Sequence, residues 1–287
     1  MWLAEFLYRK KRATRFQIEQ EWSRSNISYG KPLNRRTFQE TKNKVERLFD
    51  TTISYNAQTH EYYFEDAEIF KKNSVHNWLL KTLSVSTTLQ KYKNQQERIL
   101  LEEPATGYFY LSELLEAMDA SEQIQLTYHP FDKKPYTTLF SAYCLKAFQQ
   151  RWYVLGFSDY HQQIRTFALD RIMCIEQTTI SYSIPADFNN QLYFKDCYGI
   201  TYAPHLELHT ITLEVSPSYS PYLRTSPIHH SQQEIKKDIF QFTAFFSIEL
   251  LQKLLSYGQN IKVLSPLSIQ QRIKEEAQNM INLYNNP

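Results

Sequence analysis

The sequence predicts a multidomain α+β protein with an N-terminal winged helix-turn-helix, a central small β-barrel and a C-terminal α/β sandwich. Its 287 residues exceed the length at which a single hydrophobic core usually stops growing. Helical periodicity dominates the N-terminal segment, short evenly spaced strands dominate the middle, and strands alternate with helices beyond Pro185. We therefore place the domains at 1–65, 66–120 (a helical linker), 121–185 and 186–287.

The N-terminal segment carries the signals of three helices. Apolar side chains recur on one face of a first helix that begins near Trp2. Thr14 followed by Gln17 is a capping box, which predicts the start of a second helix. Asn34 is a good N-cap for a third helix, which we expect to end near Phe49.

A β-hairpin is predicted directly after these helices. Two strand-like runs at 52–55 and 61–64 are joined by turn-forming residues from Asn56 to His60. Three helices followed by a hairpin form the layout of a winged helix-turn-helix. The segment 66–104 reads as a mainly helical connection, and one short helix follows it.

The middle of the chain reads as a series of short strands separated by turn signals. The expected strands are 123–128, 136–143, 145–148, 152–157, 164–169 and 172–182. Many short, evenly spaced strands in so few residues predict a small, partly closed barrel.

The C-terminal segment alternates strands with helices, which predicts a small α/β sandwich. The expected strands are 210–215, 238–246 and 261–264. A short helix is expected at 217–223, a second after the N-cap Ser247, and a long last helix after Ser265, with Pro266 at its first position.

Charge is unevenly distributed along the chain. The net charge is only +2, yet residues 1–50 hold 12 Lys and Arg against 6 Asp and Glu, so the remainder is net negative. A basic end on a mildly acidic body is expected where one end meets a polyanion.

The third predicted helix carries the candidate DNA-binding residues. Long donors near the N-terminal half of such a helix can reach base edges and phosphates in the major groove. The candidates are Arg35, Arg36, Gln39, Lys42 and Asn43, flanked by Lys44 and Arg47, with His60 in the wing contacting the DNA backbone. The open alternative is an amphipathic helix of some other small helical domain.

The predicted barrel strands carry the candidate ligand-binding residues. Because strand side chains alternate, Arg165 shares a face with Phe167, and Arg151 shares a face with Tyr153. If these faces meet, two guanidinium groups and two rings converge, which suits a phosphate and a stacked base. The further candidate donors are Tyr128, Lys146 and Arg171. The alternative is structural: Trp152, Phe167 and Leu169 would be barrel core, and Asp170-Arg171 a salt link.

Several stretches resemble one known family. Residues 151–155 (RWYVL) and 165–172 (RTFALDRI) resemble the two signature stretches of the WYL-domain family of bacterial transcriptional regulators. Residues 33–38, 142–146, 194–200 and 227–235 resemble further segments of such regulators. Ala142 is a departure, because family members commonly have proline before the following tyrosine.

The resemblance implies a winged helix-turn-helix, an Sm-like (SH3-type) WYL barrel and a C-terminal extension that takes part in dimer contacts. It further implies control of transcription through double-stranded DNA, by a homodimer whose barrel senses a nucleotide or oligonucleotide effector. An alternative from another class is an accessory module that binds RNA or single-stranded DNA and assists a nuclease or defence system.

Other classes find little support in the sequence. With only 5 glycines and none of the GxSxG, GxxxxGK[ST], GxGxxG or HExxH motifs, we expect neither an enzyme nor a cofactor site. His205, His209 and the pair His229-His230 lack carboxylate or cysteine partners at metal-binding spacing. Three dispersed cysteines, no leader-like segment and no long apolar stretch predict a cytoplasmic protein without a membrane span.

Overall fold

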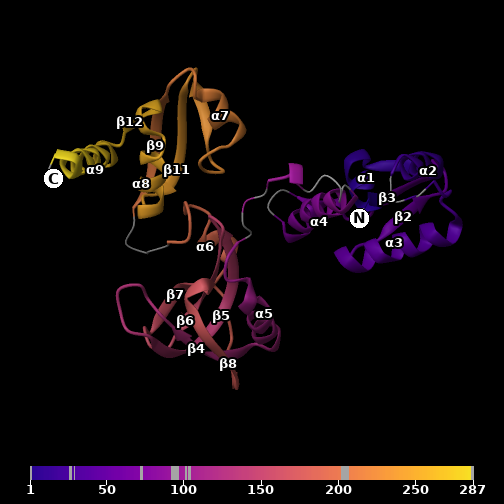
Figure 1. Ribbon diagram of the computed structural model, residues 1–287, viewed down its shortest axis with the longest axis horizontal. Coiled ribbons are helices and arrows are strands. Elements are labelled where there is room, and N and C mark those ends of the chain that lie inside the picture. The colour runs from indigo at the N-terminus through magenta and orange to yellow at the C-terminus, as the bar shows by residue number, and fades with distance from the viewer. Residues whose placement is uncertain are drawn as a thin grey trace. The chain divides into compact units, whose positions relative to one another are not determined.

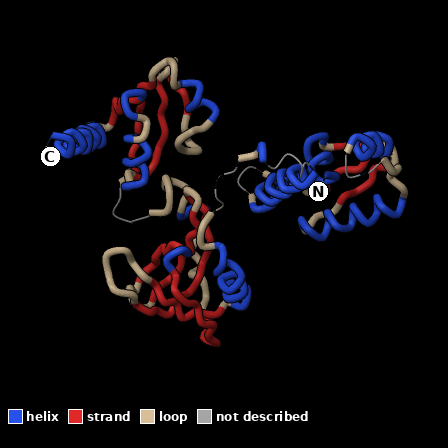
Figure 2. Tube along the Cα trace, viewed as in Figure 1, coloured by secondary structure: helices blue, strands red, loops and turns tan. Residues whose placement is uncertain are grey.

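The computed structural model describes residues 2–25, 28, 30–71, 74–91, 97–100, 102, 105–201 and 207–285. The chain forms two compact units, Met1–Glu102 and Glu103–Pro287, built from helices and antiparallel sheets (Figures 1 and 2). This confirms a protein of mixed α and β structure, while the finer limits at 65, 120 and 185 stay a prediction. In the part of the chain that the structure describes, no helix is long and apolar enough to cross a membrane.

The first part of the N-terminal unit combines three helices with a three-stranded antiparallel sheet. The helices are α1 (Trp2–Lys10), α2 (Arg15–Arg24) and α3 (Arg35–Phe49). The strands β1 (Arg12–Thr14), β2 (Ile53–Asn56) and β3 (Glu61–Phe64) form the sheet in the order β1-β3-β2. The sequence predicts the helices and the β2–β3 hairpin. It does not predict the short β1, because three residues between two helices show no alternation.

Local capping sets the helix boundaries of this unit. Thr14 and Gln17 form the predicted capping box at the start of α2. The Asn34 side chain accepts a hydrogen bond from the Thr37 amide, which confirms it as the N-cap of α3. A further short helix, η2 (Ala67–Phe70), leads to α4 (Val75–Lys91), and Phe70 is completely buried with the helix core.

The C-terminal unit begins with η4 (Tyr108–Tyr110) and α5 (Leu111–Ala120), which precede a five-stranded antiparallel sheet. Its strands are β4 (Glu122–Tyr128), β5 (Tyr136–Phe148), β6 (Arg151–Ser158), β7 (Gln163–Ala168) and β8 (Ile172–Ser181), in the order β7-β6-β5-β4-β8. Two strands expected at 136–143 and 145–148 are one long strand, β5. A register shift between Ala142 and Cys144 lets it continue through the point where the pattern breaks.

The order of these strands requires the five-stranded sheet to curl. β7 and β8 are its two edges, yet only η5 (Leu169–Arg171) separates them along the chain. The four chain steps from Ala168 to Ile172 span at most about 14 Å. The edges of a flat sheet of this width would lie about 19 Å apart. Buried side chains from β4, β5, β6 and β7 fill the inside of the curl together with α5.

A four-stranded antiparallel sheet in the order β10-β11-β9-β12 forms the rest of the unit. Its strands are β9 (Leu208–Val215), β10 (Gln233–Lys236), β11 (Ile239–Phe245) and β12 (Ile261–Ser265). The remaining helices of the unit are α6 (Asn190–Tyr193), which precedes this sheet along the chain, and α7 (Ser220–Thr225), α8 (Ile248–Leu255), η6 (Gly258–Asn260) and α9 (Leu267–Asn285). Edge strand β10 escaped prediction because all four of its residues are exposed.

Of the two N-caps predicted in this region, one is present and the other is not. Ser247 accepts from the Leu250 amide as the N-cap of α8, as predicted. The prediction that Ser265 caps the last helix was wrong. Ser265 is still part of β12, paired with Thr212, and α9 begins only at Leu267.

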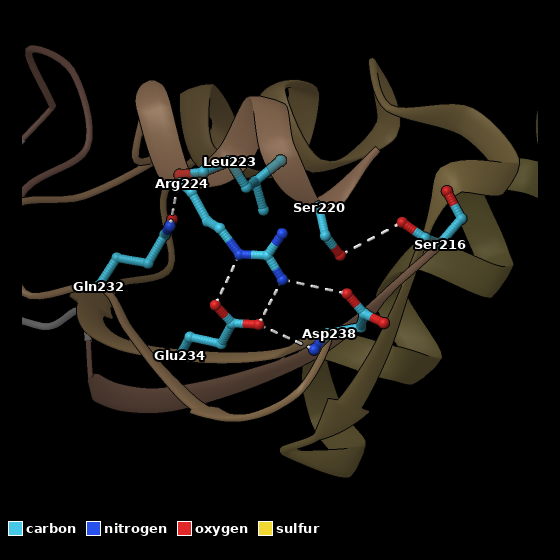
Figure 3. Close-up of polar contacts among 7 residues, drawn as sticks. All are labelled: Ser216, Ser220, Leu223, Arg224, Gln232, Glu234 and Asp238. Atoms are coloured by element: carbon cyan, nitrogen blue, oxygen red, sulfur yellow. Dashed lines mark hydrogen bonds and ion pairs between the residues drawn. The ribbon is translucent and has the colours of Figure 1, made fainter. Parts of the chain in front are cut away.

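An ion-pair network joins α7 to the β10–β11 hairpin (Figure 3). Arg224 donates from Nε and Nη2 to the two carboxylate oxygens of Glu234, at 2.8 and 2.6 Å, and from Nη2 to Asp238 at 3.3 Å. Hydrogen bonding to Arg224 lowers the pKa of Glu234 to about 2. This bidentate contact fixes the hairpin, whose strand β10 has little apolar surface of its own.

Candidate functional site

The exposed face of α3 is the first candidate site. Phe38, Val45 and Phe49 bury the opposite face of the helix in the core. This leaves Arg35, Arg36, Gln39 and Asn43 exposed or half-exposed, as the sequence predicts. These residues follow the helical spacing of three and four, so they lie on one surface.

The contacts along this face are weak and local. Arg36 pairs with Glu40 at 2.8 Å, but its side chain remains 89% exposed. Gln39 donates to Asn43 at 2.8 Å. An exposed pair at this spacing contributes little to stability, so these donors can exchange to another partner.

Lys42 has a different environment from the other candidates. Its ammonium pairs with Glu46 at 2.9 Å, and both side chains are about four-fifths buried. The same Glu46 oxygen accepts from the Ile53 amide at the start of β2. Glu46 therefore ties α3 to the hairpin, and Lys42 pairs with it along the helix. Lys44 and Arg47, in contrast, are exposed cations on the same helix.

Arg15 positions the start of α3, a role that sequence reasoning missed. Its Nη2 donates to the carbonyl of Leu33 at 2.7 Å and to that of Asn34 at 3.5 Å. Its Nε pairs with Glu19 at 2.9 Å, and the guanidinium lies 4.2 Å from the centre of the Phe38 ring. The only sequence signal was a basic residue directly after the N-cap of α2.

The tip of the β2–β3 hairpin is exposed from Ala57 to His60. The Asn56 side chain accepts from the amides of Gln58 and Thr59, which closes the turn. His60 adopts a positive φ of 55° and its Nδ1 lies 2.7 Å from the Tyr55 hydroxyl. The histidine is therefore held at the tip with a defined orientation.

The five-stranded sheet is the second candidate site, and its register changes the predicted arrangement. Phe167 pairs with Val154, and Thr166 pairs with Leu155. Because side chains alternate along a strand, Tyr153 lies on the opposite face from Phe167. The predicted convergence of the Arg151–Tyr153 face with the Arg165–Phe167 face is therefore wrong. Phe167 is 4% exposed and belongs to the core.

Four of the predicted ligand residues instead gather around η5. Arg151 pairs with Asp170 at 3.5 Å. Burial raises the pKa of Tyr128 and of Tyr153, and in both cases the nearby Arg171 guanidinium opposes the rise. Arg171 thus lies within electrostatic reach of two tyrosines that project from different faces of the sheet.

Arg171 contacts an aromatic ring and has one buried hydrogen-bond donor without an acceptor among the described residues. Its guanidinium lies 3.5 Å from the centre of the Phe131 ring, and that residue is 76% exposed. Its Nε is buried without a hydrogen-bond acceptor among the described residues. Because buried polar groups nearly always have a hydrogen-bond partner, this donor calls for a structural or functional explanation. We define the η5 cluster as Tyr128, Phe131, Arg151, Tyr153 and Arg171.

Arg165 lies in a separate aromatic group on the same sheet. Tyr136 and Tyr160 stack with ring centres 4.8 Å apart, and His161 packs edge-on against both. Burial lowers the pKa of His161, and the charges of Arg165 and Lys133 lower it further. Arg165 itself is exposed.

Lys146 does not face either group. Its ammonium donates to the Gly199 carbonyl at 2.5 Å and lies 3.8 Å from the centre of the Phe194 ring. Burial lowers its pKa. The structure therefore gives this predicted ligand donor a partner within the chain.

The histidines singled out in the sequence have separate environments in the structure. Within the described ranges, no three His, Cys, Asp or Glu side chains gather closely enough to hold a metal ion. His205 lies outside the described residues. His229 is buried, and its Nε2 contacts the Lys195 carbonyl at 3.0 Å.

Comparisons with known proteins identify two domains in the C-terminal unit. The family model of the WYL domain matches residues 110–177, and that of the WCX domain matches residues 207–281. No curated protein matches the chain. These ranges coincide with the five-stranded sheet and with the four-stranded sheet and its helices.

Two solved structures are similar in part. One is proteasome accessory factor B/C (PafBC) of Arthrobacter aurescens, with 18% identity, 95% of this chain and 44% of that chain covered, and a TM-score of 0.33. The other is a CRISPR Cas-related protein, with 9% identity, 62% and 52% covered, and a TM-score of 0.40. This chain thus spans about half the length of each. The chain therefore contains a WYL domain followed by a WCX domain.

Proposed function

We propose that this protein is a DNA-binding transcriptional regulator. In this proposal the first part of the N-terminal unit is a winged helix-turn-helix, α3 enters the major groove, and the β2–β3 hairpin is the wing. The observation that carries the proposal is the single surface formed by Arg35, Arg36, Gln39 and Asn43 on a helix whose other face is buried.

The residue types on this surface suit the reading of bases. Arginine binds guanine through two hydrogen bonds, and asparagine or glutamine binds adenine in the same way, each pair being worth about 1–3 kcal/mol of discrimination. Lys44 and Arg47 would hold phosphates. His60 would contact the backbone from the wing, and Lys42 would support α3 from within the unit.

The five-stranded sheet is proposed as an Sm-like barrel that senses a nucleotide or an oligonucleotide. The η5 cluster offers two guanidinium groups and the exposed ring of Phe131, which suit a phosphate and a stacked base. The Nε of Arg171, buried without an acceptor among the described residues, would donate to the bound ligand. Arg165 and its aromatic neighbours would extend the same binding surface.

The protein is proposed to act as a homodimer and by binding, without catalysis. The end of α9 carries four apolar side chains that are more than half exposed, and a dimer contact would cover them: Met280, Ile281, Leu283 and Tyr284. An effector would change the relative placement of the two N-terminal units in the dimer only if it binds one arrangement of them more tightly than the other.

Binding assays with variants test the DNA proposal. We expect the full chain to bind labelled duplexes in fluorescence anisotropy, and Arg35→Ala/Arg36→Ala to weaken binding at least tenfold. The matched control is Lys236→Ala/Lys237→Ala, which removes the same charge from exposed positions of the C-terminal unit. Equal binding by the two double variants would contradict the proposal.

The same assay separates the alternative function. An accessory module for RNA or single-stranded DNA would prefer single strands, and Arg35→Ala/Arg36→Ala would leave its affinity nearly unchanged. For the sensor, short single-stranded oligonucleotides are titrated against Arg171→Ala, Arg165→Ala and wild type. Equal and negligible binding by all three would refute the sensing role.

A further inference from the structure

The segment Phe194–Thr201, which we name the strap, contacts both sheets of the C-terminal unit. It follows α6 and precedes β9, so it joins the WYL domain to the WCX domain along the chain. Most connections of this kind run over the surface with few fixed contacts. The strap differs because backbone and side-chain contacts hold it on both sides.

On one side the strap is bound to the four-stranded sheet and its helices. The Phe245 amide donates to the Asp196 carbonyl at 2.7 Å, and Cys197 forms a parallel bridge with Phe245. The Thr201 hydroxyl donates to Glu249 of α8 at 2.5 Å. The rings of His229 and His230 both contact the carbonyl of Lys195, another strap residue.

On the other side the strap is bound to the five-stranded sheet. Lys146 of β5 donates to the Gly199 carbonyl at 2.5 Å, and its ammonium lies over the Phe194 ring. Phe148, at the end of β5, packs edge-on against Tyr198 with ring centres 5.7 Å apart. A hydrogen bond from a charged donor in a half-buried site is among the stronger ones.

Gly199 is the point where the two sides meet. A Cβ atom there would lie 3.1 Å from Cβ of Glu249 in α8 and 3.2 Å from Cε1 of Phe148 in β5. Its φ of +98° is also a conformation that other residues rarely adopt. Gly199 therefore passes closely between α8 and the end of β5, where an added Cβ would force its neighbours to shift by a few tenths of an ångström.

We infer that the strap couples the WYL and WCX domains into one cooperative unit, with Gly199 and Lys146 as the coupling contacts. Interfaces packed this closely have discrete arrangements and do not deform gradually. A change in the five-stranded sheet then reaches the four-stranded sheet through the strap. Because all of these contacts lie within the chain, the coupling is independent of DNA binding.

Hydrogen exchange of the full-length protein tests the coupling. In wild type we expect the slowest amides of β6 and β11 to exchange at the same rate, because both sheets open together. Gly199→Ala should separate the two rates by about tenfold or more. The matched control is Gly258→Ala, which also has a positive φ but nothing within 4 Å of the added Cβ.

A second variant keeps the test decisive if Gly199→Ala does not fold. Lys146→Met retains most of the side chain but removes the hydrogen bond to the strap, and it should also separate the rates of β6 and β11. Wild-type sheets that already exchange at different rates would overturn the inference. So would a response of Lys146→Met that matches that of Gly258→Ala.

Discussion

Replacing Arg15 tests whether the start of α3 is held by one side chain. Arg15→Ala removes a charged hydrogen bond to the Leu33 carbonyl, the ion pair with Glu19 and the contact with Phe38. A hydrogen bond from a charged group is worth about 1.5–3 kcal/mol, and a cation–π contact about 0.5–1 kcal/mol. The pair with Glu19 adds little because Glu19 is partly exposed. We therefore expect the N-terminal unit to lose about 2–4 kcal/mol of its free energy of unfolding.

Urea denaturation monitored by hydrogen exchange in peptides of α2 and α3 measures this change. Arg9→Ala is the matched control, because it removes the same charge and an exposed pair with Glu21 at 3.4 Å. That variant should change the free energy of unfolding by less than about 0.5 kcal/mol. Equal destabilisation of the unit by Arg15→Ala and Arg9→Ala would refute this role of Arg15.

Three further predictions concern the C-terminal unit. Because Arg224 lowers the pKa of Glu234 to about 2, their contact stabilises the fold fully above pH 4.5 and loses effect as the pH falls toward 2. The difference in free energy of unfolding between wild type and Arg224→Gln should shrink over that range, and a constant difference would be evidence against the contact. Burial lowers the pKa of His229, so the folded state resists its protonation and stability should fall as the pH drops below about 6.5. In thermal melts from pH 7 to 5, His229→Gln should reduce this slope and leave the contribution of His161, whose pKa is also lowered; an unchanged slope would contradict the assignment. Gly107→Ala, at a φ of +83°, places a Cβ atom 2.6 Å from Cβ of Leu169 in η5 and should lower the free energy of unfolding by about 2–4 kcal/mol. Gly30→Ala adds its Cβ in open space and should lower it by only about 1 kcal/mol. Similar shifts in melting temperature for the two variants would count against the close packing at Gly107.

Features encoded by neighbouring residues could be predicted from the sequence. The capping box of Thr14 with Gln17 and the N-caps Asn34 and Ser247 each depend on contacts within four residues, and all three are present. The exposed face of α3 follows from helical periodicity alone. These local signals were enough to locate the first candidate site.

Features that depend on pairing between distant segments could not be predicted. Alternation shows which side chains of one strand share a face, but the offset to the next strand decides which faces coincide. For this reason the prediction that the faces carrying Tyr153 and Phe167 converge was wrong. The contact of Glu46 with the Ile53 amide and that of Lys146 with the Gly199 carbonyl likewise form only in the folded chain.

The salt dependence of duplex binding tests the central claim most directly. Removing one cation that binds a phosphate should reduce the slope of log affinity against log salt by about one. We predict a steep decrease of affinity between about 50 and 200 mM salt for the full chain. The slope should be shallower by about two for Lys44→Ala/Arg47→Ala, which removes the two α3 cations proposed to hold phosphates, and unchanged for Lys236→Ala/Lys237→Ala. A duplex affinity independent of salt, or a slope that responds only to the lysine pair, would contradict DNA binding through α3.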